Sequence, residues 1–438
     1  MGQIASNNLI QSLSSTQLDL IRRVANEAHA RGFPLYAVGG LPRDILLRKP
    51  IGDLDLVVEG NAIELARSLA SKYGGKVTAH TKFGTAKIDV QGWGIESSDS
   101  LKDQSRGTID LISARSETYR HPGALPTVKM GTIEDDIRRR DFTINTLAIR
   151  LDGAHFGELR DDFGGLSDLE SRRVCVLHTR SFLDDPTRMF RAARYEQRYS
   201  FRIADESLAL IPEACPLVAK LSAQRVRHEF DAILEEPKVA SILARLAELN
   251  LLKAVHAALP GDKSIRMRLE AEPRPELLTR HRPGAVEAKA DNRDLRWILW
   301  LITLSPKELE SVNKRLHFTA ARHEALVEAS KLFVKLHSFV NLKPSQWVER
   351  LEGLPGLAVY ATYLAAANGK PKNALESYLA EWRHVRPKTT GHDLKRLGLE
   401  PGPKYKSILR ELQSAWLDGK IQSHTEEMGY LERLLEKS

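Results

Sequence analysis

Two aspartates separated by a single residue, Asp53 and Asp55, are the side chains in this sequence best suited to chemistry. On a β-strand, residues two apart face the same side, so both carboxylates would converge while Leu54 points into the core. Two like charges that close repel each other unless a cation lies between them. Carboxylate oxygens are the ligands that Mg²⁺ prefers, and Asp110 is a candidate third carboxylate for a two-metal site. The alternative is a pair of exposed aspartates at a strand end.

A glycine turn precedes this pair of aspartates. Gly39 and Gly40 follow a short apolar run, and Arg43 and Asp44 follow them after two intervening residues. Two glycines after a strand let the backbone approach a phosphate, and the following helix would point its free N–H groups at that phosphate. Arg43 could add a charge-assisted contact, and Asp44 could hold the arginine in place. A plain tight turn is the other interpretation, but the spacing lets the turn share a pocket with the aspartates.

Apolar periodicity predicts the elements that would position these residues. Apolar residues recur every three to four positions in two segments, which predicts helices at 17–32 and 61–73. Short apolar or alternating runs predict strands at 35–38, 53–58, 76–80, 86–90 and 108–114. Segment 93–106 is polar and resembles a hairpin loop, and the Pro- and Arg-rich segment 272–294 resembles a linker. Beyond about residue 132, helical patterns prevail.

These elements predict an α+β head with a mixed sheet and helices, followed by an all-α neck, body and tail. A chain of 438 residues is long enough for roughly two to four domains. We expect the head at 1–150, the neck at 151–238, the body at 239–380 and the tail at 381–438.

Composition is that of an ordinary globular protein, with 42% apolar and 28% charged residues. No apolar stretch approaches the roughly 20 residues of a membrane helix, and residues 1–15 lack the pattern of a signal peptide. The two cysteines match no metal or redox spacing, so we expect reduced core residues in a cytoplasmic protein. The net charge of +8 falls on residues 241–438, because residues 1–240 sum to about zero. This excess fits either a solvated helical surface or a surface for a polyanion.

The pattern Gly-Gly-x-x-Arg-Asp followed by Asp-x-Asp resembles the polymerase-beta-like nucleotidyltransferases. More closely, it resembles the class II CCA-adding enzyme and bacterial poly(A) polymerase family. Residues 138–148 resemble that family's second motif, where arginine, aspartate and asparagine engage the incoming ribose and triphosphate. In this chain the matching residues are Arg139, Arg140, Asp141 and Asn145. The resemblance continues in family order over about residues 35–235.

The fourth block of resemblance implies how a base is chosen. It comprises Asp184, Asp185, Pro186, Thr187 and Arg188, followed by Arg191 and Arg194. In the family, the aspartate and arginine matching Asp185 and Arg188 hydrogen-bond the Watson–Crick edge of the incoming base, so that the protein replaces a template. We expect Pro186 in the first turn of a helix, with Asp185 and Arg188 three residues apart on its face. The alternative is an ordinary helical salt bridge worth roughly 0.2–0.5 kcal/mol.

Two further blocks and three departures complete the comparison of motifs. Residues 161–165 with Asp168 resemble the third motif, thought to couple head and neck, and residues 221–229 resemble the fifth. Asp184 stands where the family usually has glutamate, Asp162 where proline is common, and Gln224 where glutamate is common. None of these removes an expected metal or base ligand, but they leave the fine nucleotide preference open.

The C-terminal segment resembles the tail of some bacterial family members. It reads as two helices joined by a Pro-Gly turn, with Lys404, Lys406 and Arg410 at one end. These cations would either grip the tRNA phosphate backbone or form a solvated face of a packing module. The neighbouring His392 and Asp393 could suggest a metal phosphohydrolase, but the further histidines and aspartates of that chemistry are not found nearby.

The resemblance implies a tRNA 3′-terminal nucleotidyltransferase that adds C and/or A from CTP or ATP with Mg²⁺, without a template, and releases pyrophosphate. A poly(A) polymerase would share the head, but residues 56–61 resemble the CCA-adding branch. Separate CC-adding or A-adding activity and a non-catalytic RNA-binding protein remain as alternatives. The sequence leaves the product, its termination and the oligomeric state open.

Overall fold

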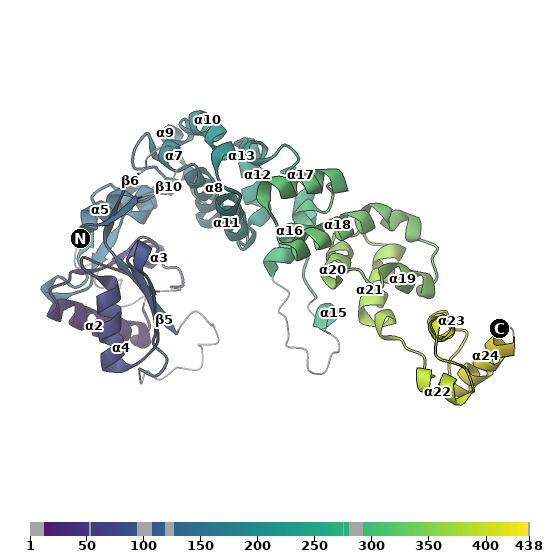
Figure 1. Cartoon of the computed structure of the whole chain (residues 1–438). Coiled ribbons are helices and arrows are strands. Elements are labelled where there is room, and N and C mark those ends of the chain that lie inside the picture. Colours follow the sequence, from purple (N-terminus) through teal and green to yellow (C-terminus); the bar gives the residue numbers. More distant parts are fainter. Residues whose placement is uncertain are drawn as a thin grey trace. The chain divides into compact units, whose positions relative to one another are not determined.

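The computed structural model describes residues 13–51, 54–93, 107–118, 127–274, 276–279 and 292–436. These residues form two compact units, Met1–Leu221 and Ser222–Ser438 (Figure 1). The predicted division into four parts stays a prediction. The predicted loop at 93–106 lies outside the described residues from 94 onward, and so does most of the predicted linker at 272–294.

A mixed seven-stranded sheet forms the framework of the first unit, in the order β3-β4-β5-β2-β1-β8-β9. β2 and β5 are parallel, and the other neighbouring pairs are antiparallel. The strands are β1 (Leu35–Val38), β2 (Leu54–Val58), β3 (Val77–His80), β4 (Thr85–Asp89), β5 (Thr108–Ser113), β8 (Ala148–Arg150) and β9 (Leu159–Arg160). The first five confirm the predicted strands. β8 and β9 were not expected, and β9 joins the sheet beyond the predicted head boundary at residue 150.

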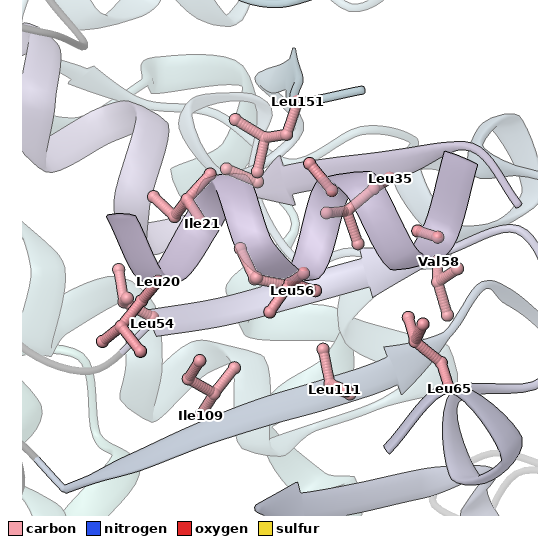
Figure 2. Close-up of a cluster of buried hydrophobic side chains, with 14 of the residues drawn as sticks. Leu20, Ile21, Leu35, Leu54, Leu56, Val58, Leu65, Ile109, Leu111 and Leu151 are labelled. Atoms are coloured by element: carbon pink, nitrogen blue, oxygen red, sulfur yellow. The ribbon is translucent and has the colours of Figure 1, made fainter. Parts of the chain in front are cut away.

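Helices α2 (Ser15–Ala30) and α4 (Ala62–Tyr73) cover one face of the sheet with an apolar core. Leu20 and Ile21 of α2 lie over Leu54 and Leu56 of β2 in that core (Figure 2). Ser14 caps α2 by a reciprocal capping box with Gln17. Helix α5 (Ile133–Arg138) packs through Ile133 and Ile137 with Val57, which points to the opposite face of β2.

Short elements complete the first unit. The hairpin β6–β7 and the parallel pair β10–β11 form two small separate sheets. The pair β10–β11 lies in a segment predicted to be all-α, and two-residue strands are too short to show a period in the sequence. These elements are α3 (Gly40–Leu46), η1 (Thr81–Phe83), β6 (Arg115–Thr118), β7 (Thr127–Met130), η2 (Thr143–Asn145), η3 (Gly153–His155), α6 (Gly165–Glu170), β10 (Arg173–Val174), α7 (Ser181–Asp184), α8 (Thr187–Tyr199), β11 (Arg202–Ile203), α9 (Asp205–Leu208), α10 (Ile211–Ala214) and η4 (Cys215–Lys220).

Every described element of the second unit is helical, as expected. The aromatic rings of Phe230, Trp297 and Trp300 meet in its core with centroids 5.0–5.7 Å apart. The helices are α11 (Ala223–Leu234), α12 (Val239–Glu248), α13 (Leu251–Val255), α14 (Ser264–Leu269), α15 (Glu276–Thr279), α16 (Asn292–Leu301), α17 (Pro306–Leu316), α18 (Ala320–Lys335), η5 (Leu336–Phe339), α19 (Pro344–Leu351), α20 (Gly356–Ala365), α21 (Lys370–Ala380), η6 (Trp382–His384), α22 (Gly391–Arg396), α23 (Pro403–Leu417) and α24 (His424–Glu436). Among the described residues, no helix combines the length and apolarity needed to cross a membrane.

The last three helices share a small core of their own around Leu394, Leu412 and Leu431. The fully buried Glu427 of α24 accepts hydrogen bonds from the N–H groups of Lys388 and Thr389. α24 was not foreseen, because the tail motif predicts only two helices.

Candidate active site

The two described acidic residues of the predicted metal site lie side by side. β2 and β5 run parallel, and Asp55 is the register partner of Asp110. Register partners on neighbouring strands point to the same face, and the alternate residues Leu54 and Ile109 point into the core on the other face. Asp55 is exposed and Asp110 is partly exposed. Asp53, the first residue of the predicted triplet, lies outside the described residues.

Lys87 of β4 also reaches this carboxylate pair. Its Nζ atom lies 3.1 Å from Oδ2 of Asp110, and the two residues are register partners. Among the residues that the structure describes, no group of three His, Cys, Asp or Glu side chains forms a metal-binding cluster. Since Asp53 is not among them, the predicted three-carboxylate set stays a prediction. The two carboxylates that are described fit Mg²⁺, because they present hard oxygen donors on one exposed face.

The glycine turn is built for a close approach by an arginine. Gly39 has a φ of +78°, and its N–H donates to the carbonyl oxygen of Leu147 at 3.1 Å. A Cβ atom added to Gly39 would lie 2.3 Å from Nη1 of Arg140. Gly40 is different, because its φ is not positive and an added Cβ would make only an ordinary contact, 3.6 Å from Nη2 of Arg43. The sequence did not indicate that the glycine serves a protein side chain as well as the expected phosphate.

A chain of polar contacts links α3 with α8. The buried Arg43 donates from Nε and Nη2 to both oxygens of Asp44, at 3.0 and 3.1 Å, as expected from the sequence. Its Nη1 donates to Oδ1 of Asn145 at 2.5 Å. Asn145 donates from Nδ2 to Asp141 at 2.8 Å, and Arg191 donates from Nε to the other oxygen of Asp141 at 2.7 Å. Five of the predicted nucleotide-binding residues are therefore in one network.

Asp141 is ionised within that network. Burial alone would raise the pKa of its carboxyl, but the charge of Arg191 and the hydrogen bond from Asn145 outweigh burial and lower the pKa. Arg188 acts on Asp141 in the same direction. A charged carboxylate in a buried position needs such partners to be stable. Asp141 therefore orders the surrounding donors.

A second buried carboxylate, Asp136, holds the two predicted triphosphate-binding arginines. Arg139 donates from Nε to Oδ1 of Asp136 at 2.9 Å, and Arg140 donates from Nη2 to Oδ2 at 2.8 Å. Burial opposes ionisation of Asp136, but Arg140 and Arg139 outweigh it and lower its pKa. Glu117 of β6 accepts a further bond from Nη1 of Arg139 at 3.2 Å. The sequence reasoning missed Asp136, although its spacing of three and four residues from the arginines was a usable signal.

Two tyrosines of α8 were also missed. The guanidinium carbon of Arg43 lies 4.7 Å from the ring centre of Tyr199 and 5.4 Å from that of Tyr195. Tyr199 donates from its hydroxyl to Asp44 at 3.3 Å, and burial raises its pKa. Arg194, predicted to bind nucleotide, stacks on Tyr195 with its guanidinium carbon 5.6 Å from the ring centre. The four-residue spacing of the tyrosines on a helix could have revealed them.

The predicted base-reading pair is placed differently from the expectation. Asp185 does not lie on the helix of Arg188 but ends α7 with an extended backbone, φ −135° and ψ 98°. The residue before a proline is disfavoured in the helical region, so the chain breaks at Pro186, which becomes the N-cap of α8. Asp185 accepts from the N–H and hydroxyl of Thr187 at 2.9 and 2.7 Å. Its neighbour Asp184 lies 3.9 Å from Nε of Arg180.

Arg188 is 5% exposed and projects from the first turn of α8. Its Nη1 donates to the hydroxyl of Ser181 at 2.7 Å, and its Nη2 donates to the carbonyl oxygen of Arg139 at 2.8 Å. The second motif and the fourth motif are thus joined through a main-chain carbonyl.

Residues of the third motif pack against Thr143 of the second motif. Asp161 lies ahead of α6 and accepts from the N–H groups of its first two residues, Gly165 and Leu166, at 2.7 and 3.0 Å. Asp168 of α6 accepts from the hydroxyl of Thr143 at 2.7 Å, and a Cβ on Gly165 would lie 2.3 Å from the carbonyl oxygen of Thr143. This packing holds the short element that carries Asn145.

In the second unit, the structure places Lys404, Lys406 and Arg410 on α23 with exposed side chains. Asp393 accepts from the N–H and hydroxyl of Thr390 as part of a capping box for α22. This contact gives Asp393 a structural role at the start of α22.

Known proteins resemble this chain over nearly its whole length. Residues 35–175 match the poly A polymerase head domain, and residues 200–260 match a probable RNA and SrmB- binding site of polymerase A. The chain is 30% identical to the A-adding tRNA nucleotidyltransferase of Halalkalibacterium halodurans over 95% of its own length and 93% of that protein. It is 32% identical to the A-adding tRNA nucleotidyltransferase of Geobacter sulfurreducens, of which it spans 46%.

Solved structures agree with the sequence matches. An apo form of a CCA-adding enzyme superposes with a TM-score of 0.80 and 30% identity over 99% of this chain and 98% of that one. Similar CCA-adding enzymes have been solved with ATP, with CTP and, from Thermotoga maritima, with tRNA_CCA. The chain therefore belongs to the family of tRNA nucleotidyltransferases that includes the A-adding and CCA-adding enzymes.

Proposed function

We propose that this protein adds C and/or A from CTP or ATP to the 3′ end of tRNA without a nucleic-acid template and releases pyrophosphate. The observation that carries the proposal is the placement of Asp55 and Asp110 as register partners on one exposed face of two parallel strands. Membership of the family supports the reaction, and the similar enzymes solved with ATP, CTP and tRNA support these substrates.

Asp55 and Asp110, together with Asp53, would hold Mg²⁺. When bound, Mg²⁺ lowers the pKa of the attacking 3′-hydroxyl and stabilises the charge of the leaving pyrophosphate. Lys87, which pairs with Asp110 at 3.1 Å, is positioned to neutralise further charge on that face. The protein's part of the chemistry is to fix the carboxylates before the substrates arrive.

Gly39, Gly40, Arg43, Arg139 and Arg140 would position the triphosphate. The contacts of these arginines with Asp44, Asn145 and Asp136 support this role, since they orient the guanidinium groups before the nucleotide arrives. Positioning of this kind is the main catalytic contribution in phosphoryl transfer.

Asp185 and Arg188 would choose the base, aided by Asp184, Arg191 and Arg194. Arginine offers donors and aspartate offers acceptors, so a fixed pair of them can accept cytosine or adenine and reject other bases. Sites that hydrogen-bond a substrate can reject poorly matched ones by on the order of 10⁴. Both sequence relatives described above are named for adenosine addition, which favours ATP as the substrate.

Three tRNA transcripts test the function and its product. They end before CCA, after C and after CC, and each is incubated with Mg²⁺ and labelled CTP or ATP. Addition of one labelled A to the transcript ending in CC supports an A-adding enzyme, and stepwise C and A addition supports a CCA-adding one. Long A tracts would instead reveal a poly(A) polymerase, and no label on any transcript would refute the proposal.

A matched pair of variants tests the metal site. Asp110→Asn should reduce kcat by on the order of 10³, because a metal ligand is worth several kcal/mol of transition-state stabilisation. Asp89→Asn is the control, since Asp89 lies on the neighbouring strand and accepts a bond from the N–H of Gln91. Equal activity of the two variants would rule out Asp110 as a ligand.

A further inference from the structure

Arg188, the proposed base reader, is held by two acceptors that come from different elements. Ser181 is the first residue of α7, and Arg139 is the C-cap of α5. The hydroxyl of Ser181 accepts from Nη1 at 2.7 Å, and the carbonyl of Arg139 accepts from Nη2 at 2.8 Å. Ser181 is 0% exposed, so water does not compete for its hydroxyl.

Two acceptors on the two terminal nitrogens define the plane of a guanidinium group. With both bonds made, rotation about the last side-chain bonds of Arg188 would break at least one of them. The donors that remain then point in fixed directions, because the five N–H groups of arginine form a rigid planar fork. A single acceptor would leave the fork free to swing about that contact.

Arg139, whose carbonyl is the second acceptor, is held by further contacts. The side chain of Arg139 donates to Asp136 and to Glu117. The main-chain N–H of Arg139 donates to the carbonyl of Asp135 at 3.3 Å. Ser181 is held from the other side, since its N–H donates to the carbonyl of His178 at 3.1 Å. Both residues that supply the acceptors are therefore held by further hydrogen bonds of their own.

We propose that Ser181 is a positioning residue for nucleotide selection, because its buried hydroxyl and the carbonyl of Arg139 fix the plane in which Arg188 reads the base. The proposal rests on the proposed function and adds a specificity determinant that lies outside the base-reading pair itself. A guanidinium group held in one plane matches the hydrogen-bonding edge of the accepted base. A guanidinium group that can rotate could also form hydrogen bonds with guanine or uracil.

Ser181→Ala tests the proposal through the ratio of kcat/KM for ATP or CTP to kcat/KM for GTP or UTP on the same tRNA transcripts. Removal of one hydrogen bond to a charged group should lower this ratio by about tenfold. A merely structural role would lower all four values together and leave the ratio unchanged. Ser181→Thr keeps a hydroxyl acceptor and should restore discrimination.

Ser207→Ala is the matched control. Ser207 is another buried serine of the first unit, and its hydroxyl accepts from the N–H of Val176 at 3.0 Å. The Ser207→Ala variant should lower the melting temperature as much as Ser181→Ala does. It should keep the wild-type ratio of kcat/KM values. Ser181→Cys preserves the side-chain volume with a weaker acceptor, so it replaces the alanine variant if that variant does not fold.

The assays distinguish a failure of the proposed function from a failure of the role proposed for Ser181. No incorporation by the wild-type protein would refute the proposed function. Normal incorporation by the wild type, with unchanged discrimination in a folded Ser181→Ala or Ser181→Cys variant, would refute the role of Ser181 alone. Equally reduced discrimination in Ser207→Ala would show a general loosening of the unit and would also overturn the inference.

Discussion

At the scale of residues, buried carboxylates organise the candidate site. Asp136 and Asp141 are almost fully buried, and each is bound by arginine. A buried charge without a partner is strongly unfavourable, so these aspartates and their arginines must fold as a unit. Asp136 thereby fixes Arg139 and Arg140, and Asp141 fixes Arg191 and Asn145. The cations expected to meet a triphosphate are oriented in advance by the protein's own anions.

Replacement of Asp136 by asparagine should destabilise the protein in a pH-dependent way. Breaking a buried ion pair costs about 3–5 kcal/mol, because the arginines are left without their counter-charge. The pKa of Asp136 is lowered in the folded state, so its stabilisation is complete above the unfolded value of about 3.9 and is lost as pH falls below it. Urea unfolding of wild type and Asp136→Asn at several pH values measures this difference.

The exposed pair Glu134–Arg138 on the same helix provides the control for that experiment. Glu134→Gln should change the free energy of unfolding by less than about 1 kcal/mol, since water and salt screen exposed pairs. The difference between wild type and Asp136→Asn should shrink in acid. A difference that stays constant from neutral to acid pH would contradict the assignment of an ionised Asp136.

At the scale of elements, two adjacent glycines have different reasons to be glycine. Gly39 ends β1 with a positive φ and lies against the guanidinium of Arg140. Gly40 begins α3 in a conformation open to any residue. The first glycine of this motif therefore meets a backbone and packing requirement that the second glycine does not have.

Gly39→Ala and Gly40→Ala should behave differently. The first forces a side chain into a positive-φ position, which costs roughly 1–2 kcal/mol, and it also displaces Arg140. Gly40→Ala should leave the free energy of unfolding within about 1 kcal/mol of wild type, because alanine is the better helix former. Thermal unfolding of both variants measures the contrast, and equal destabilisation would contradict it.

At the scale of the whole molecule, charge is distributed unequally between the parts of the chain. Residues 241–438 carry the excess of positive charge that makes the net charge +8. Lys404, Lys406 and Arg410 are exposed on α23, and their side chains lie outside the small apolar core of α22–α24. Cations presented on a folded helix can contact a polyanion without disturbing the packing of the core.

Binding of tRNA should weaken steeply as salt increases. Each neutralised phosphate releases counterions, and six to ten of them would reduce the affinity by about 10³–10⁵ between roughly 50 and 200 mM salt. Replacing Lys404, Lys406 and Arg410 together by alanine should make the slope of log K against log salt shallower by about 0.9 for each phosphate that the variant no longer neutralises. Filter binding or fluorescence anisotropy over a salt series measures the slope.

A triple replacement of the same charge serves as the control for that series. Arg22, Arg67 and Lys76 are exposed residues of the first unit, and the first two lie on α2 and α4, which cover the sheet face opposite Asp55 and Asp110. Their replacement by alanine should leave the slope near that of wild type. An equal change in both triple variants would assign the effect to net charge rather than to α23.

The sequence by itself determined what depends on local pattern. Apolar periodicity predicted α2, α4 and the first five strands, since each spans enough residues to show its period. Motif spacing predicted which residues would gather around the glycine turn, and Arg43, Asp44, Asp141, Asn145 and Arg191 do share one network. It also identified the family, because five motifs recur in order along the chain.

Only the tertiary structure decided what depends on contacts between distant segments. β8 and β9 are two or three residues long. β8 pairs with β1, which lies far away in the sequence, and β9 pairs with β8. The register of Asp55 with Asp110, the bond from Arg139 to Glu117, and the bond from Arg188 to the hydroxyl of Ser181 all join separate elements. A period or a motif records neighbours along the chain, whereas a buried charge or hydroxyl takes its partner from whichever segment the fold brings within a few ångströms.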